Sequence, residues 1–465
     1  FYVVGLWITI ITTSLKSLLK KHKTMKRLFI LMILLLHLLS ACATNTRQSP
    51  TTSSTTHAPT PIETQSPGFH CAEVTEIPIN ECQSLVALYL QMGGPNWDTN
   101  YEEWVGKDLW LETKTPCSWG GVTCAEGHVS EITLVRVSTL PGKLPAEIAS
   151  LSRLTKLDLR ENQLRQGPPE IGELVNLTDL SLDFNDLDSL PSEINHLTNL
   201  KSLSLTENQI SKMPEIGGLT RLVELSLGYN YLYDTPAGLG NLSRLENLNI
   251  KRNQITTLPP EIGNLTNLTA LDISGNTLGA IPPEIGRLTN LVYLDISQNN
   301  LDRLPPEIGN LVNLTIFFSA SDNQLRRIPP EIGKLTQLSE LSFANNQIKT
   351  IPSEIGNLTK LTYLDLSDNK LTILPPELGK LTNLEMLYLS DNNLNAVPPE
   401  MGNLNRLILL YLRDNYLTNL PVEFGNLTNL SELWLDGNEL DSISPELCAA
   451  LAGRVYPPSL CGHQE

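Results

Sequence analysis

The chain has 465 residues and a formal net charge of −17, and 41% of its residues are apolar although only 6% are aromatic. An acidic surface repels the phosphate backbone of nucleic acids, so this charge argues against a nucleic-acid partner. It suits solubility and a basic partner, and a solvated acidic surface without any partner is the alternative. Because so few residues are aromatic, Leu and Ile must form most of the core. Such a uniform core composition is a first sign of a repeat protein. The His residues are scattered and no C-x2-C pair occurs, so we expect neither a metal site nor a cofactor.

Residues 1–24 form an apolar segment followed by several lysines, and the segment begins with Phe1, not Met. We interpret it as sequence translated upstream of a start at Met25. A membrane helix is the alternative, but the apolar run from Phe1 to Ile11 is shorter than the roughly 20 residues that such a helix needs.

Residues 25–41 have the organisation of a signal peptide, because a basic start precedes an almost purely apolar run from Leu28 to Leu39. The segment ends in Leu39-Ser40-Ala41-Cys42, which resembles the lipobox of bacterial lipoproteins. The resemblance implies that Cys42 is lipidated and anchors the protein to a membrane, at the cell surface or in the periplasm. Cleavage at Ala41-Cys42-Ala43 is the alternative and would release a secreted protein. Both alternatives predict export.

Residues 42–69 are rich in Thr, Ser and Pro and poor in large apolar residues. Such a segment cannot bury enough surface to offset its chain entropy. We expect a flexible tether between the membrane and a folded part.

One pattern recurs between residues 127 and 447: L-x-x-L-x-L-x-x-N-x-L-x-x-L-P-P-E-I-G-N-L-T-N. The L-x-L part predicts a short strand with alternate residues inward, and stacked copies predict a parallel sheet. The Pro-Pro segment predicts the opposite, convex wall. The asparagine can pair backbone groups where the chain turns out of the strand. These asparagines are Asn162, Asn185, Asn208, Asn230, Asn253, Asn276, Asn299, Asn323, Asn346, Asn369, Asn392, Asn415 and Asn438.

The asparagine spacing is 23 residues except for one spacing of 22 and one of 24, and a degenerate first copy from Val129 gives about 14 repeats. This pattern is identified as that of the leucine-rich-repeat family. The resemblance implies an α/β solenoid, a curved horseshoe with a parallel sheet on its concave face. The L-P-P-E-I-G-N-L form is similar to that of Ras-binding scaffold proteins and plant receptor ectodomains. The apolar burial within a single repeat cannot offset the chain entropy that is lost when it folds. Stability comes from stacking on neighbouring repeats, so the repeats at both ends need caps.

Residues 70–126 are predicted to cap the N-terminal end. An amphipathic helix is predicted from Glu81 to Tyr89. The tryptophans that follow are interpreted as cap core, with a ligand platform as the alternative, and they are Trp97, Trp104 and Trp110.

The run C-S-W-G-G-V-T-C from Cys117 to Cys124 resembles the cap of plant receptor-like leucine-rich-repeat proteins. The resemblance implies that these two cysteines pair and that the tryptophan between them closes the open end of the core. Residues 448–465 are predicted to cap the other end, with Cys448 paired to Cys461.

Six of the seven cysteines form close pairs along the sequence. A solenoid keeps its ends apart, which excludes pairing between the C-terminal pair and the other four. Among those four, adjacency and the plant-like spacing favour Cys71–Cys82 and Cys117–Cys124. Disulfides at both ends agree with export.

The 24-residue repeat carries one extra residue, which we place within Phe317–Asp322, between the strand and the asparagine. An added residue in a strand bulges out or turns the following side chains to the other face. We therefore expect a local bulge, with Phe318 on the concave side. The alternative is a harmless loop variant.

The third, fifth, seventh and eighth residues of L-x-x-L-x-L-x-x-N point out of the sheet. They are small and polar in the middle of the solenoid but aromatic and acidic from the eleventh repeat on. Tyr388, Tyr411 and Trp434 would form an aromatic ladder with an acidic rim, which is typical of interface hot spots. The predicted partner-binding residues are Tyr363, Asp365, Asp368, Met386, Tyr388, Asp391, Leu409, Tyr411, Arg413, Asp414, Trp434 and Asp436.

Two alternatives stay open for the concave face. Aromatic residues also suit a parallel sheet that binds nothing. A second, weaker patch is expected around Phe184, Tyr229 and Arg252.

The sequence therefore predicts a non-enzymatic, surface-anchored protein that binds a protein or peptide on its concave face, for recognition, adhesion or signalling. The acidic rim of that face suits a partner with basic residues. A structural envelope protein or adhesin spacer without a defined ligand is the alternative. An enzyme of the effector type is a remote one, because no unpaired cysteine, phosphate loop or catalytic triad is recognisable in or after the repeats.

Overall fold

The computed structural model describes residues 69–94, 97, 109–137, 142–451 and 453–461. The chain divides into two units, residues 1–63 and 64–465. The expectations for the segment 1–24, the signal peptide, Cys42 and all of the tether except Phe69 fall outside the described residues.

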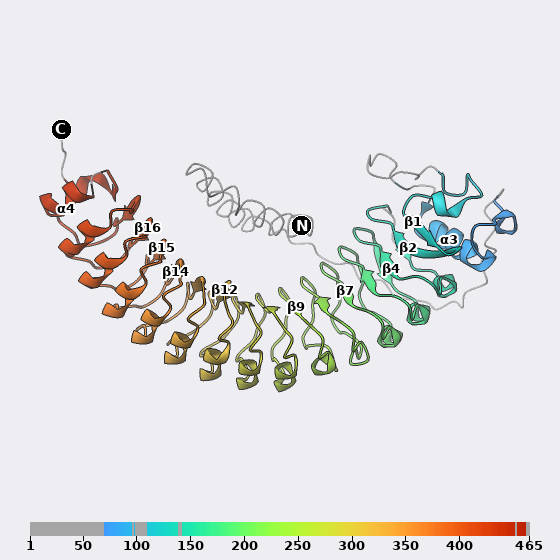
Figure 1. Ribbon diagram of the computed structural model, residues 1–465, viewed down its shortest axis with the longest axis horizontal. Coiled ribbons are helices and arrows are strands. Elements are labelled where there is room, and N and C mark those ends of the chain that lie inside the picture. The colour runs from blue at the N-terminus through green and yellow to red at the C-terminus, as the bar shows by residue number, and fades with distance from the viewer. Residues whose placement is uncertain (1–68, 95–96, 98–108, 138–141, 452, 462–465) are drawn as a thin grey trace, which may run out of the picture. The chain divides into compact units, whose positions relative to one another are not determined.

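The described part of the solenoid forms an arc, with strands along its inner side and 3-10 helices along its outer side (Figure 1). A sheet of sixteen strands follows the inner side, and all of them except β1 and β18 come from repeats, one from each, as the predicted count of fourteen requires. In spatial order they are β1 (Val122–Ala125), β2 (His128–Thr133), β4 (Lys156–Asp158), β6 (Asp179–Ser181), β7 (Ser202–Ser204), β8 (Glu224–Ser226), β9 (Asn247–Asn249), β10 (Ala270–Asp272), β11 (Tyr293–Asp295), β12 (Phe317–Ser319), β13 (Glu340–Ser342), β14 (Tyr363–Asp365), β15 (Met386–Tyr388), β16 (Leu409–Tyr411), β17 (Glu432–Trp434) and β18 (Val455–Tyr456).

The strands of the repeats pair in parallel and in register, as between β10 and β11, where Leu271 lies opposite Leu294. The first pair, β1 with β2, is antiparallel. A separate two-stranded sheet joins β3 (Gly142–Lys143) to β5 (Leu164–Gln166). Leucines of the repeat point inward and are fully buried, and together they form one core along the solenoid.

The Pro-Pro-Glu segments form one turn of 3-10 helix each on the outer side, where proline fixes the backbone before the first helical residue. The repeat of 22 residues, which lacks one residue near Met213, has no such helix between residues 211 and 219. The helices of the repeats are η5 (Ala146–Ser150), η6 (Pro169–Glu173), η7 (Ser192–His196), η8 (Leu239–Asn241), η9 (Pro260–Asn264), η10 (Pro283–Arg287), η11 (Pro306–Asn310), η12 (Pro330–Lys334), η13 (Ser353–Asn357), η14 (Pro376–Lys380), η15 (Pro399–Asn403) and η16 (Val422–Asn426).

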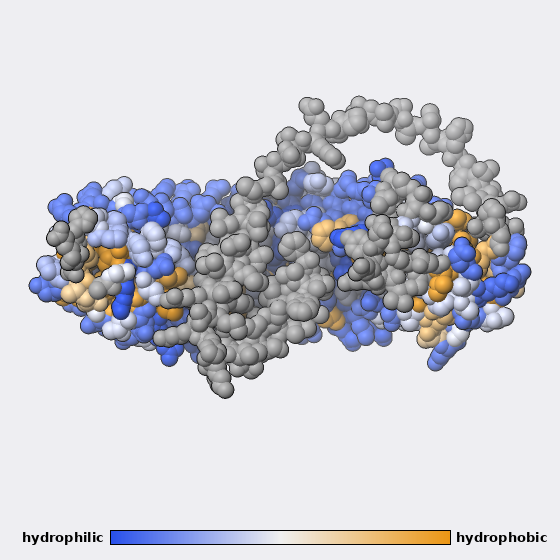
Figure 2. Space-filling view, turned by 90° about the horizontal axis from the view of Figure 1, so that it is seen from above, coloured by the Kyte–Doolittle hydropathy of each residue, from blue (hydrophilic) through white to orange (hydrophobic). Residues whose placement is uncertain are grey.

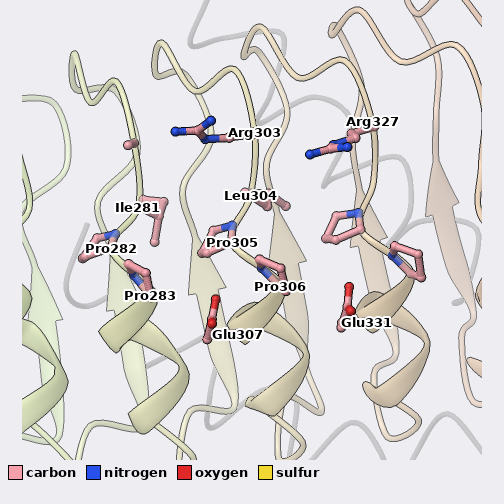
Figure 3. A pocket seen from close by; sticks show the side chains of 13 residues that line it. Ile281, Pro282, Pro283, Arg303, Leu304, Pro305, Pro306, Glu307, Arg327 and Glu331 are labelled. Carbon is pink, nitrogen blue, oxygen red and sulfur yellow. The ribbon is translucent and has the colours of Figure 1, made fainter.

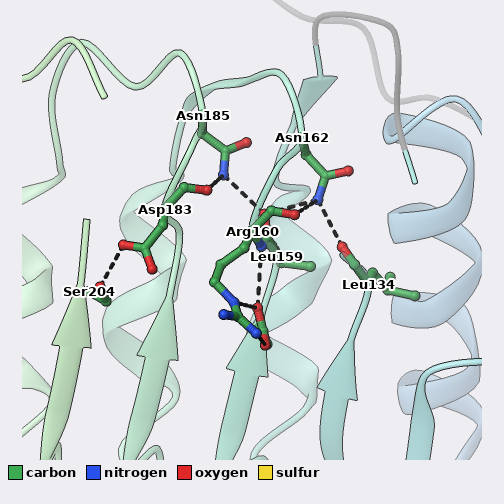
Figure 4. A network of polar contacts seen from close by, with 8 residues as sticks. Leu134, Leu159, Arg160, Asn162, Asp183, Asn185 and Ser204 are labelled. Atoms are coloured by element: carbon green, nitrogen blue, oxygen red, sulfur yellow. Dashed lines mark hydrogen bonds and ion pairs between the residues drawn. The ribbon is translucent and has the colours of Figure 1, made fainter. Parts of the chain in front are cut away.

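The repeated asparagines bind the backbone of two neighbouring turns at once. Figure 4 shows the amide nitrogen of Asn185 donating to the carbonyl of Leu159 in the preceding repeat, over 3.0 Å. Its Oδ1 accepts the amide of Leu164, also over 3.0 Å. The first repeat has Val137 in place of asparagine, and Asn162 of the next repeat accepts the amide of that valine. This ladder satisfies backbone groups that the buried turn cuts off from water.

The N-terminal cap consists of η1 (Cys71–Glu73), α3 (Ile79–Gln91), η4 (Pro116–Ser118) and β1. The helix predicted from Glu81 to Tyr89 is confirmed. Trp110 and Trp119 are buried and their ring centroids lie 4.9 Å apart, so they belong to the core of the cap. Trp97 is buried as well, whereas Trp104 lies outside the described residues.

A buried carboxylate ties the helix of this cap to the first repeat. Glu81 on α3 accepts hydrogen bonds from the backbone amide of Val129, over 2.8 Å, and from Nδ1 of His128, over 2.6 Å. Its side chain is 2% exposed, so the two partners replace the water that it loses.

The C-terminal cap consists of α4 (Pro445–Ala450), β18 and η17 (Pro458–Cys461). Ser444 caps α4, because its hydroxyl accepts the amide of Leu447. β18 extends the sheet by pairing in parallel with β17.

The three predicted disulfides, Cys71–Cys82, Cys117–Cys124 and Cys448–Cys461, are confirmed, with Cα–Cα distances of 5.7, 5.5 and 5.5 Å. Disulfides in both caps are typical of exported proteins.

The bulge predicted within Phe317–Asp322 is wrong. β12 pairs in register with β11 and β13, and Phe318 is fully buried against Phe343. The extra residue instead lies upstream of the strand, between Leu314 and Phe317, where Ile316 is 55% exposed. A turn ahead of the strand absorbs the insertion at less cost, because it leaves the alternation of the strand intact.

Candidate functional site

The concave face carries the side chains that alternate with the buried leucines. In β14, for example, Leu364 is buried while Tyr363 and Asp365 on either side reach the surface. Figure 2 looks onto this face, and towards its left, C-terminal end pale and orange residues interrupt the blue hydrophilic ones. The predicted partner-binding residues of β14 to β17 all lie at such outward positions.

The predicted aromatic ladder is present. Ring centroids are 5.5 Å apart between Tyr363 and Tyr388, 5.0 Å between Tyr388 and Tyr411, and 5.9 Å between Tyr411 and Trp434. The contacts are tilted or edge-to-face, which is the favourable geometry for rings. Each ring is half-buried, not fully exposed as expected, because its neighbours cover part of it.

Tyr456 extends the ladder into the C-terminal cap. Its ring stacks on Trp434 with centroids 4.6 Å apart and planes 14° apart. Sequence reasoning missed this residue because it lies outside the repeat pattern. Its place in a short Arg-Val-Tyr run directly before two prolines was a signal of one more strand. We call the five rings Tyr363, Tyr388, Tyr411, Trp434 and Tyr456 the aromatic ladder.

Carboxylates accept hydrogen bonds from the polar ends of these rings. Glu432 accepts the indole N–H of Trp434 over 2.9 Å and the hydroxyl of Tyr411 over 3.2 Å. Burial, and then the charge of Glu432, raises the pKa of Tyr411 to about 12. Burial likewise raises the pKa of Tyr388. The phenols therefore stay protonated and act as hydrogen-bond donors at neutral pH.

The rim of the ladder is acidic. Asp368, Asp391 and Asp414 are exposed and occupy the last position before the asparagine, where the backbone has φ of 53°, 54° and 49°. Aspartate tolerates this left-handed region better than most residues do. Burial, and then the neighbouring carboxylates Asp391 and Asp365, raise the pKa of Asp368.

The cation of Arg413 lies beside the ladder and is already paired. Arg413 binds Asp436, with 2.6 Å between its Nη2 and Oδ2, and its guanidinium lies 5.2 Å from the ring centroid of Trp434. Arg413 thus makes a cation–π contact with the face of the indole. Met386 and Leu409 fill the outward position of their strands beside the rings, so all the predicted residues gather on one surface.

A further ring pair lies on the same face. Tyr293 and Phe317 stack with centroids 5.3 Å apart and planes 20° apart. The predicted bulge placed Phe318 on the concave side. Phe317 was therefore not among the predicted partner-binding residues.

The second predicted patch is more dispersed. Phe184 and Tyr229 are 42% and 41% exposed, and Lys251 lies 5.8 Å from the ring centroid of Tyr229. Tyr231 and Tyr233 add exposed rings on the adjoining flank.

The N-terminal half of the concave face contains a polar network that the chain itself satisfies (Figure 4). Arg160 binds Asp158 over 2.7 Å, and Asp183 accepts the hydroxyl of Ser204 over 2.5 Å. Burial raises the pKa of Asp183 despite these partners. The network stabilises the sheet.

A hollow of about 560 Å³ lies on the outer side, where the chain enters η10, η11 and η12. Figure 3 shows rows of proline rings, with Arg303 and Arg327 on one side and Glu307 and Glu331 on the other. The Pro-Pro-Glu part recurs in seven of the fourteen repeats, so this shape follows from the repeat itself.

Within the described ranges, no group of three or more His, Cys, Asp or Glu side chains could hold a metal ion. Nor is any helix in those ranges long and apolar enough to cross a membrane.

A family model described as leucine-rich repeat region matches residues 170–274, 237–343, 284–368 and 350–452, and a second one, leucine-rich repeat, matches residues 153–174. The chain belongs to the leucine-rich-repeat family.

Solved structures agree with this assignment. A leucine-rich-repeat protein of Leptospira interrogans is 41% identical, with a TM-score of 0.62, over 68% of this chain and 79% of that one. An internalin of Listeria monocytogenes is 25% identical, with a TM-score of 0.55, over 69% and 91% of the two chains. The plant peptide hormone receptor RGFR1, in complex with RGF2, is 33% identical, with a TM-score of 0.57, over 71% and 66%.

Proposed function

We propose that this chain is a non-enzymatic binding protein whose aromatic ladder holds an extended segment of a protein or peptide that carries basic residues. The single observation that carries the proposal is the continuous contact of five rings across β14 to β18, with the exposed carboxylates Asp368, Asp391 and Asp414 along one edge. Aromatic rings with a charged rim are typical of binding hot spots.

Two further observations support a peptide ligand. The similar plant receptor was solved in complex with a peptide hormone. The ladder from β14 to β18 spans four strand spacings, or about 19 Å, which matches roughly six residues of extended peptide.

The experiment is selection from a displayed library of random dodecapeptides on the purified full chain. Synthetic versions of the selected peptides are then titrated against the wild type and against Tyr388→Ala/Tyr411→Ala/Trp434→Ala. The loss of three ring contacts should weaken binding at least about 100-fold. The matched control, Tyr231→Ala/Tyr233→Ala, removes exposed rings outside both predicted patches and should leave the affinity unchanged.

A second variant separates binding from folding, because the ladder rings also pack on one another. Asp368→Asn/Asp391→Asn/Asp414→Asn removes only charge at exposed positions, and asparagine also tolerates the left-handed backbone. It should fold like the wild type and bind basic peptides several-fold more weakly. Selection that enriches no peptide would favour a structural spacer instead. Peptides that bind the ring variant and the carboxylate variant as tightly as the wild type would contradict a binding site on the aromatic ladder.

We also propose that the protein is exported and anchored through a lipid on Cys42, on the basis of the motif Leu39-Ser40-Ala41-Cys42. Mass spectrometry of the mature N-terminus tests this. A diacylglyceryl adduct on Cys42 is expected, and it should be lost together with membrane association in Cys42→Ala. An unmodified terminus at Thr44 would contradict it.

A further inference from the structure

The run of rings along the concave face is interrupted at one strand. Rings are in contact between β11 and β12, through Tyr293 and Phe317, and again from Tyr363 on β14 to the end of the sheet. Between them lies β13, whose residue in the same row is Glu340. A carboxylate therefore takes the place of a ring.

The register sets this carboxylate between two rings. Glu340 lies opposite Phe317 on one side and opposite Tyr363 on the other. The two flanking strands are two spacings apart, about 9–10 Å. A cation centred between them would lie about 5 Å from each ring, within the reach of about 6 Å for a cation–π interaction.

Unlike Glu432 and Asp365 on the same face, Glu340 accepts no hydrogen bond from the described residues. Glu432 accepts bonds from Tyr411 and Trp434, and Asp365 accepts the hydroxyl of Ser367 over 2.6 Å. No hydrogen bond or ion pair joins Glu340 to the described residues, and its side chain is open to solvent. The surrounding protein nevertheless raises its pKa by desolvation.

No basic side chain of the flanking strands can neutralise Glu340. The outward residues of the repeats of β12, β13 and β14 include no Lys or Arg. Beside Glu340, the small residues Ser321 and Ser342 are buried, and their hydroxyls bind each other over 2.6 Å.

We propose that Glu340, between Phe317 and Tyr363, holds one Lys or Arg side chain of the bound peptide. This inference rests on the proposed function and adds a defined cation site beyond the aromatic ladder. The carboxylate supplies the charge, and the two rings supply cation–π contacts to a cation that has left water. The distance from β13 to β17 is about 19 Å, so the basic residue lies roughly six positions from the peptide residue that contacts Trp434.

The test is a double-mutant cycle with the selected dodecapeptides. Each Lys of a peptide is replaced by Gln and each Arg by the neutral isostere citrulline. Every peptide is titrated against the full-length wild type, Glu340→Gln and Glu354→Gln. The last variant is the matched control, because Glu354 is an exposed glutamate on η13, on the outer side.

One basic position should couple to Glu340. Its replacement should weaken binding to the wild type and to Glu354→Gln about tenfold and leave binding to Glu340→Gln unchanged. If peptides bind through the aromatic ladder but no basic position couples to Glu340, this inference is overturned and the proposed function stands. If selection enriches no peptide, both are overturned.

Discussion

Trp434 and Tyr456 stack across β17 and β18, and this contact joins the aromatic ladder to the C-terminal cap. The disulfide Cys448–Cys461 ties α4 to η17 on either side of β18. The cap therefore positions one end of the proposed binding face as well as closing the core.

Removal of this disulfide should loosen the last strand. A loop of this length contributes about 3 kcal/mol through chain entropy, so Cys448→Ala/Cys461→Ala should let β18 detach more often. The amide of Leu435 donates to the carbonyl of Tyr456 over 2.7 Å, and its hydrogen exchange should become faster. Selected peptides should bind several-fold more weakly. The matched control, Cys117→Ala/Cys124→Ala in the other cap, should leave both readouts at the C-terminal end unchanged, and an effect of equal size there would contradict the idea.

The asparagine ladder should dominate the stability of single repeats. Asn276 donates to the carbonyls of Ile250 and Ile273, and its Oδ1 accepts the amide of Ile255, all over 3.0 Å. Asn276→Ala leaves these buried groups unpaired and should cost about 2–4 kcal/mol in urea unfolding.

Asn267→Ala is the matched control for the asparagine ladder. Asn267 is exposed and makes one hydrogen bond, from its amide nitrogen to the carbonyl of Ser243, so its loss should cost at most about 1 kcal/mol. Equal losses of unfolding free energy in the two variants would show that the hydrogen bonds of the asparagine ladder stabilise the protein no more than an exposed one does.

The repeat made most of this fold predictable. The period fixes which residues point inward, so the sequence identified both the buried leucines and the outward rings from Tyr363 to Trp434. What it could not fix was the place of an insertion between two adjacent phenylalanines, because either Phe317 or Phe318 could occupy the leucine position. It also missed Tyr456, since the cap has its own fold and lies outside the repeat pattern.

The two adjacent phenylalanines should respond differently to truncation. Phe318 is fully buried and packs edge-on against Phe343, with centroids 5.7 Å apart. Phe318→Ala should therefore cost about 3–5 kcal/mol, as measured by urea unfolding. Phe317 lies half-buried on the concave face, so Phe317→Ala should cost much less. If Phe317→Ala lowered the free energy of unfolding more than Phe318→Ala, the result would support the bulge with Phe318 on the concave side.

Two carboxylates that face each other on β10 and β11 should make stability depend on pH. Asp272 and Asp295 are partners in register, and Lys251 lies near Asp272, with 3.5 Å between Nζ and Oδ2. Burial, and then the charge of Asp272, raises the pKa of Asp295. A raised folded-state pKa means that stability is fully present below the unfolded value of about 3.9 and is lost as the pH rises through the folded-state value.

Asp295→Asn should therefore stabilise the protein by about 0.5–1 kcal/mol at pH 7. Asparagine keeps the Oδ1 that accepts the amide of Ser297 over 2.9 Å, so the charge is the main change. The gain should shrink as the pH falls and vanish below about pH 3.9, where Asp295 is neutral in both states. Urea unfolding of the wild type and the variant between pH 3 and 7 measures it, with Asp302→Asn at an exposed position as the control. A gain that persists unchanged at pH 3 would mean that something other than charge repulsion between Asp272 and Asp295 sets the stability of this pair of strands.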